Sequence, residues 1–328
     1  MVREWQRIAA AIALAAMAVA CAPTQPAPTK PPQRAVLSLD WVPNTNHTGL
    51  YVAMEKGYYK EQGLAVEIVS PADPAAALRA VAAGQTHFGV SFQEEVTVSR
   101  ANGIPVVSIA AILQHNTSAF AALADTGLSS PKDWEGKRYG SYGLPLEPPV
   151  IEGLMECAGA DFSQVEFVDV GFDAYPALVN RQVDFIWIFQ GWDGIQAELQ
   201  GVELSVVPLM GSCIPDYYTP VLIAGETTLS EQPDLVGNFL AATTRGYEYA
   251  IEHPAEAAEI LLQYAPESDA ELVRRSQAWL SPYYQAEAAQ WGVQRGAVWA
   301  DFAEWMNERG LLPQMIDSEQ AYTNEFLP

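Results

Sequence analysis

The side chains best suited to chemistry gather in one short loop near the start of the chain. The loop follows an apolar run, 35–39, and offers a carboxylate, two amides, an indole and an imidazole, from Asp40, Asn44, Asn46, Trp41 and His47. Such groups hold a small polar ring by stacking and by hydrogen bonds to its edge. The sequence shows no metal-ligand spacing and no nucleophile motif. We therefore expect a binding protein and no enzyme, with no catalytic residue, metal or cofactor.

The elements around this loop predict how it is positioned. An apolar run at 35–39, a helical segment at 49–56 and a second apolar run at 64–69 form one strand–helix–strand unit. In open α/β sheets, ligands bind at loops that follow the carboxyl ends of strands. Trp41 also fits a role as core or surface filler, and His47 also fits a capping role. The flanking Asp40 and Asn44 favour a binding function for the loop.

Two further segments of the first half end strands with polar side chains. Phe92 and Gln93 stand where the strand 88–92 turns into a helix, and Asn116 follows the long apolar run 104–113. Side chains and free N–H groups at such a junction point toward a ligand crevice. A capping box of Ser91 and Glu94 would explain the same junction in part.

The second half of the chain carries a comparable set. Trp192 and Asp193 follow the predicted strand 183–189, which contains Trp187. Alternation along that strand places some of its aromatic residues in the core. Tyr142 ends another predicted strand, and Tyr218, next to Tyr217, lies where the chain crosses back to the first half.

The combined aromatic lining favours a flat heteroaromatic ligand. Stacking suits the ring faces, while amides and carboxylates bind donors at the ring edge. Arginine is scarce at these positions, which argues against sulfonate, nitrate or phosphate. A sugar remains an open alternative, because tryptophan and acidic or amide side chains also bind sugars.

The N-terminus predicts export and a lipid anchor. Two arginines precede an apolar run, 8–20, which is too short to span a bilayer and is typical of a signal peptide, so we assign residues 1–20 to it. The run ends at Ala18-Val-Ala-Cys21, which resembles a lipobox, and the proline-rich segment 21–34 has the composition of a tether. We expect lipidation of Cys21 and a location at the cell membrane, facing the periplasm or exterior. A cleaved signal with an incidental cysteine is the alternative.

Composition limits the partners and leaves the remaining thiols undecided. With 17 basic and 40 acidic residues, the chain has a net charge of −23, which opposes binding to nucleic acid and anionic lipid. We therefore expect membrane attachment by the lipid alone. Cys157 and Cys213 fit a disulfide, or equally two separate small apolar residues.

Repeated strand–helix alternation predicts an α/β fold with two lobes and mostly parallel sheets. We expect the first lobe in 35–122 and 220–328, the second in 123–219, and the hinge near Ala121–Leu123 and Thr219–Val221. The ligand would lie between the lobes, which close on it.

Several segments resemble the thiamine-pyrimidine-precursor-like solute-binding proteins of ABC importers. The resemblance rests on Leu39–Ala53, Glu55–Leu64, Gly89–Gln93, Ile104–Ala111 and Trp187–Gly194, and it covers nearly all of the chain after the tether. It implies a type II periplasmic-binding-protein fold, a small-molecule ligand, and permease and ATPase partners.

Within that family the resemblance leaves two ligands open. Members are similar to receptors for a formyl-aminopyrimidine, and a RibY-type branch serves riboflavin. The second-half tryptophans, Trp187 and Trp192, exceed what one pyrimidine needs and favour riboflavin. A fungal branch makes the thiamine pyrimidine with a cysteine-rich motif that is absent from this sequence. A synthase is therefore the weaker alternative.

Overall fold

The computed structural model describes residues 31–71 and 76–328, and residues 33–328 form one compact unit. The predicted signal peptide 1–20 and the lipidation site Cys21 lie outside the described residues. The first strand already begins at Gln33, so the last two residues of the predicted tether belong to the folded part. Within the described ranges, no helix has the length and apolar character needed to cross a membrane.

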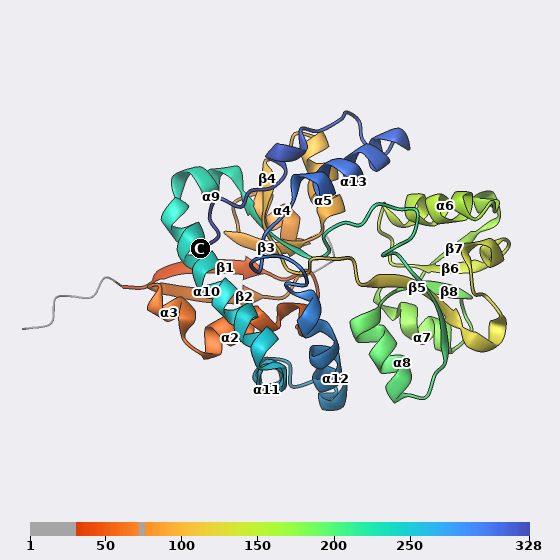
Figure 1. Cartoon of the computed structure of the whole chain (residues 1–328), viewed down its shortest axis with the longest axis horizontal. Coiled ribbons are helices and arrows are strands. Elements are labelled where there is room, and N and C mark those ends of the chain that lie inside the picture. Colours follow the sequence, from red (N-terminus) through yellow and green to blue (C-terminus); the bar gives the residue numbers. More distant parts are fainter. Residues whose placement is uncertain (1–30, 72–75) are drawn as a thin grey trace, which may run out of the picture. The chain divides into compact units, whose positions relative to one another are not determined.

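The first sheet has five strands in the order β2-β1-β3-β10-β4 (Figure 1). Their bounds are β1 Gln33–Ser38, β2 Leu64–Val69, β3 Phe88–Ser91, β4 Val106–Ala111 and β10 Val221–Gly225. The strands β1, β2 and β3 are parallel, whereas β10 runs antiparallel to both β3 and β4. The strand β10 therefore brings the chain back into the first sheet at Val221.

The second sheet also has five strands, in the order β7-β6-β8-β5-β9. Their bounds are β5 Ser118–Leu123, β6 Arg138–Ser141, β7 Glu166–Asp169, β8 Phe185–Phe189 and β9 Leu204–Pro208. β5 lies between β8 and β9 and is antiparallel to both. The strand order of the two sheets, with one late strand inserted in the first, is the predicted type II arrangement.

The position of β5 shows that the first crossing lies earlier in the chain than predicted. The chain passes between the sheets at 112–117, before β5, and not near Ala121–Leu123. Every residue of β5 is buried, and three of its six residues are alanines. Such a run shows no alternation of polar and apolar residues, so the sequence pattern did not identify it as a strand. The second crossing, 209–220, includes the predicted Thr219.

Helices cover both faces of the first sheet. One face packs on α2, α10 and α11 in the largest core cluster, and the other packs on α4, α5 and α13. The helices are α2 Thr48–Glu55, α3 Tyr58–Glu61, α4 Ala76–Ala82, α5 Gln93–Ala101, α6 Glu147–Cys157, α7 Ala174–Val179, α8 Ile195–Leu199, α9 Glu226–Glu231, α10 Pro233–Glu252, α11 Pro254–Tyr264, α12 Ala270–Leu280 and α13 Gly296–Glu308. The longest of the described helices is α10, with 20 residues.

The C-terminal helix departs from the predicted division into lobes. Phe302, Trp305 and Met306 of α13 pack in one cluster with residues of the second sheet and of α6. The Phe302 ring stacks on Tyr217 with 4.2 Å between centroids. Residues 220–328 therefore do not serve the first sheet alone, because α13 contributes to the cores of both sheets.

Cys157 and Cys213 form a disulfide, which decides between the two alternatives left open by the sequence. Their Cα atoms are 6.6 Å apart, and 56 positions separate them in the chain. The bond connects the last residue of α6 to the second crossing. It therefore attaches the helix that covers the second sheet to the segment that leads back to the first.

Candidate functional site

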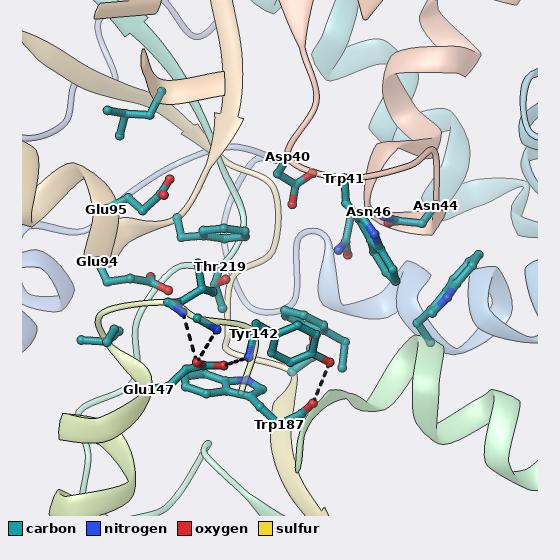
Figure 2. A pocket seen from close by; sticks show the side chains of 18 of the residues that line it. Asp40, Trp41, Asn44, Asn46, Glu94, Glu95, Tyr142, Glu147, Trp187 and Thr219 are labelled. Atoms are coloured by element: carbon teal, nitrogen blue, oxygen red, sulfur yellow. Dashed lines mark hydrogen bonds between the residues drawn. The ribbon is translucent and has the colours of Figure 1, made fainter. Parts of the chain in front are cut away.

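A cavity of about 510 Å³ is lined by residues from both sheets (Figure 2). Six aromatic side chains contribute to its wall: Trp41, Phe92, Tyr142, Trp187, Phe189 and Trp192. Trp41 and Phe92 follow β1 and β3 of the first sheet, while the other four lie on or directly after β6 and β8 of the second. All these strands direct their carboxyl ends toward the cavity, as expected for a site in an α/β protein.

Eight of the twelve residues that the sequence singled out line this cavity. They are Asp40, Trp41, Asn44, Phe92, Tyr142, Trp187, Trp192 and Asp193. The other four, His47, Gln93, Asn116 and Tyr218, are buried away from the wall and support it. The structure thus gives these four a supporting place and no contact with the cavity.

His47 holds the carboxylate of Asp40. The His47 Nε2 lies 2.7 Å from Asp40 Oδ1, and its Nδ1 accepts a hydrogen bond of 3.2 Å from the backbone N–H of Asn44. Because Nδ1 accepts, the proton of the neutral ring is on Nε2 and is donated to Asp40. The fully buried imidazole therefore fixes the orientation of a carboxylate that faces the cavity.

Gln93, Tyr218 and Asn116 use their polar groups within the protein. The Gln93 carboxamide accepts from the Tyr218 N–H at 2.8 Å and donates to the Val298 carbonyl at 3.1 Å. The Tyr218 hydroxyl accepts from the Arg295 N–H at 2.9 Å. Asn116 Oδ1 accepts from the Ser118 N–H at 2.8 Å. These bonds join the second crossing to α5, α5 and the second crossing to the start of α13, and the first crossing to β5, so their role is to stiffen the connection.

A charged cluster joins the same two crossings at the protein surface. His115 of the first crossing lies 2.6 Å from Asp216 of the second and 2.9 Å from Glu287. Burial lowers the pKa of His115, but the hydrogen bonds to the two carboxylates outweigh it and raise the pKa. Asp216 also accepts from the Asn116 N–H at 3.0 Å. The cluster therefore holds the crossings together on the solvent side.

Two helices, α10 and α12, hold the loop that carries Trp41. The Tyr247 hydroxyl of α10 donates to the Asn46 carbonyl at 2.7 Å, and Ser276 of α12 lies 2.6 Å from the Thr45 hydroxyl. Asn44 caps the short 3-10 turn Thr45–His47 through its own side chain. Because its backbone is fixed at several points, the loop presents Trp41 with little freedom.

Glu147 organises the opposite wall and was missed by the sequence patterns. Its carboxylate, 1% exposed, accepts from the hydroxyls of Tyr139 and Ser141 and from three backbone N–H groups of the loop 142–144. Figure 2 shows the bonds from the backbone of this loop to Glu147 as dashed lines. The loop turns at Gly143 with a φ of 82°, a conformation that favours glycine. A strand end followed by glycine and proline was the signal that a loop of this kind begins here.

Carboxylates dominate the charge of the cavity wall. Asp40, Glu94, Glu95, Glu147 and Asp193 line it, whereas Arg79 is the basic residue of the lining among the described positions. Burial raises the pKa of Asp193 to about 6, against the effect of a hydrogen bond from the Phe189 N–H at 2.8 Å. A wall of this charge favours ligands that donate hydrogen bonds and disfavours anions.

The fold matches solved solute-binding proteins. The nitrate-binding protein NrtA from Synechocystis PCC 6803 superposes with a TM-score of 0.72 at 13% identity, covering 90% of this chain and 87% of that chain. The alkanesulfonate-binding protein SsuA from Xanthomonas axonopodis pv. citri superposes with a TM-score of 0.69 at 14% identity, covering 90% and 99%. The predicted two-lobed α/β fold is thereby confirmed. The fold is thus shared with these solute-binding proteins, and in this chain residues from both sheets line one cavity.

The chain belongs to the NMT1/THI5-like family, whose profile matches residues 44–257. It is 30% identical to a formylaminopyrimidine-binding protein of Halalkalibacterium halodurans, over 87% of this chain and 88% of that protein. It is 29% identical to the riboflavin-binding protein RibY of Chloroflexus aurantiacus, over 94% and 91%. A 4-amino-5-hydroxymethyl-2-methylpyrimidine phosphate synthase of Legionella pneumophila is 30% identical, over 90% and 92%. The resemblance inferred from the sequence is thus confirmed.

Proposed function

We propose that this protein is the extracytoplasmic receptor of an ABC importer and that it captures riboflavin for the permease and its ATPase. The observation that carries the proposal is the ring of six aromatic side chains, contributed by both sheets, around a cavity of about 510 Å³. A cavity of that size falls within the usual range for drug-sized ligands, roughly 300–1,000 Å³. A three-ring isoalloxazine uses more stacking surfaces than a single pyrimidine ring does.

The acidic wall supports a neutral, donor-rich ligand. Riboflavin carries an imide N–H and several hydroxyl groups, and these donors match the carboxylates of Asp40 and Asp193. The relative RibY, 29% identical, is a riboflavin-binding protein by name. The scarcity of basic side chains in the lining distinguishes this cavity from one built for an oxyanion.

A formylaminopyrimidine is the second candidate ligand. It is favoured by the same carboxylates, since an aminopyrimidine also offers N–H donors, and by the 30% identical formylaminopyrimidine-binding relative. Direct comparison of the two compounds by titration separates the candidates. Affinity for the pyrimidine without measurable affinity for riboflavin would replace the first candidate by the second.

A synthase is the competing class of function, raised by the relative from Legionella pneumophila. The sequence argument against it is the missing cysteine-rich motif. Cys157 and Cys213 are joined to each other and stand outside the cavity lining, which agrees with that argument. Incubation with candidate substrates, followed by mass spectrometry of the products, tests this class. Formation of an aminopyrimidine phosphate would establish the enzyme.

The proposed location is the outer face of the cell membrane, with attachment by a lipid on Cys21. This part of the proposal rests on the sequence of residues 1–34 alone. The mass of the mature protein extracted from membranes tests it: an unmodified N-terminus would exclude the anchor.

Replacing Trp41 or Trp192 by alanine is expected to weaken ligand binding by about 1–3 kcal/mol each, on the scale of aromatic stacking and interface burial. The two residues face the cavity from the first and second sheets. Isothermal titration of each variant with the ligand that binds the wild-type protein measures the loss of affinity. Val42→Ala is the matched control, because Val42 is 51% exposed and lies outside the lining, so its affinity should not change. Unchanged affinity in both tryptophan variants would refute the site.

A further inference from the structure

Two buried polar atoms in the cavity wall have no hydrogen-bond partner among the described residues. They are Oε2 of Glu94 and Nε1 of Trp187. Glu94 lies in the first turn of α5, which follows β3 of the first sheet, and Trp187 lies on β8 of the second sheet. Folded proteins rarely leave such atoms unpaired, because desolvation without a partner is costly. A ligand in the cavity can supply both partners.

The local structure gives Glu94 no other function. The capping box of Ser91 and Glu94 that the sequence suggested is not formed, since the Ser91 hydroxyl donates instead to Glu95 Oε2 at 2.6 Å. The cap residue of α5 is Phe92, without a side-chain cap. Figure 2 shows the Glu94 side chain extending from its helix toward Thr219 and the cavity. The carboxyl group is therefore directed at the ligand space while its neighbour Glu95 is engaged.

We propose that the Glu94 carboxyl group binds the ring edge of the ligand that carries an acceptor beside an N–H donor, while Trp187 Nε1 donates to a second acceptor. An imide and an amino-substituted diazine both present such an edge. This inference rests on the proposed function and names the recognition element that the two candidate ligands share. Because the two groups come from different sheets, the ligand that pairs with both also connects the lobes.

Protonation suits Glu94 to this role. Burial, with a smaller contribution from the charge of Glu95, raises the pKa of Glu94 to about 8. A protonated carboxyl offers one donor and one acceptor and so matches the edge with two hydrogen bonds. A deprotonated carboxylate offers acceptors only and would face the acceptor of the ligand. Binding should therefore be strongest below about pH 8 and weaken above it.

Several other ionisable groups surround Glu94. Glu95 lies on the same helix as Glu94, and Arg79 faces the cavity from α4. Asp40 and Asp193 belong to the opposite walls. Tyr217 of the second crossing interacts with the charge of Glu94, and burial raises the pKa of this phenol far above its ordinary value. Asp193 changes charge near pH 6, two pH units below Glu94. A transition near pH 8 thus reports on Glu94.

Glu94→Gln and Glu94→Met test the assignment with riboflavin and the formylaminopyrimidine at pH 7 and pH 9. Glutamine keeps one donor and one acceptor, so its affinity should stay within a few-fold of wild type at pH 7 and should not fall at pH 9. Methionine has neither, and its affinity should drop roughly 10-fold or more. Asp301→Asn on the exposed side of α13 is the control. Wild-type affinity in Glu94→Met would overturn the inference and leave the proposed function standing.

If the wild-type protein binds neither compound, the proposed function is refuted. Thermal unfolding without ligand then still tests the inference about Glu94. If Glu94 is held for a ligand, removing its unpaired carboxyl in Glu94→Met should raise the unfolding temperature. A clear fall in the unfolding temperature would show that Glu94 is a structural residue and would overturn the inference.

Discussion

Gly246→Ala is expected to destabilise the protein by about 3 kcal/mol or more, because the new methyl group meets fixed backbone. A Cβ at Gly246 of α10 would lie 2.0 Å from the carbonyl oxygen of Gly49 and 3.0 Å from the Ala53 side chain, both on α2. The two helices must separate to admit it. Since Tyr247 anchors the Asn46 carbonyl of the binding loop, ligand affinity should fall as well.

Denaturant unfolding measures the loss, and Gly237→Ala is the matched control. Gly237 lies in the same helix, and a Cβ there meets nothing within 4 Å. Its replacement should stabilise the protein by about 0.5–1 kcal/mol through helix propensity. Equal unfolding midpoints for the two variants would contradict the close approach of α2 and α10.

Loss of the disulfide between Cys157 and Cys213 is expected to cost about 4 kcal/mol, near the upper end of values for single disulfides. The bond closes a long loop, since the cysteines are 56 positions apart in the chain, and so restricts the unfolded chain strongly. It also holds the second crossing, which contributes Thr219 to the cavity wall. The double variant Cys157→Ser, Cys213→Ser should unfold at a lower denaturant concentration than the oxidised wild type.

The same unfolding experiment with a reducing agent supplies the control for the disulfide. Reductant should shift the wild-type midpoint down to that of the double serine variant and leave the variant itself unchanged. An identical wild-type midpoint with and without reductant would contradict the stabilising role of this bond.

Local patterns predicted those parts of the site whose position depends on strand ends. Asp40, Trp41, Trp192 and Asp193 follow strands whose apolar runs are bounded by polar loops, and the carboxyl ends of such strands meet in an α/β fold. The strand β5 was missed for the opposite reason. Its complete burial removes the alternation by which a strand is recognised.

The supporting residues could not be separated from cavity residues without the tertiary structure. Gln93 is polar and follows a strand, as a ligand contact would, yet it bonds to Tyr218, 125 positions further on. Glu94 shows the reverse case, because its spacing from Ser91 fits a cap that the structure does not form. Whether a buried polar group bonds to the protein or faces a cavity depends on residues distant in the chain.

Titration of the purified protein with riboflavin, followed by flavin fluorescence and repeated with the formylaminopyrimidine, tests the central claim most directly. We predict saturable quenching by one equivalent of riboflavin with a Kd of about 1 μM or tighter, reversal on dilution, and no chemical change in the ligand. Failure of both ring compounds to bind at micromolar concentrations would contradict a receptor for a flat heteroaromatic ligand.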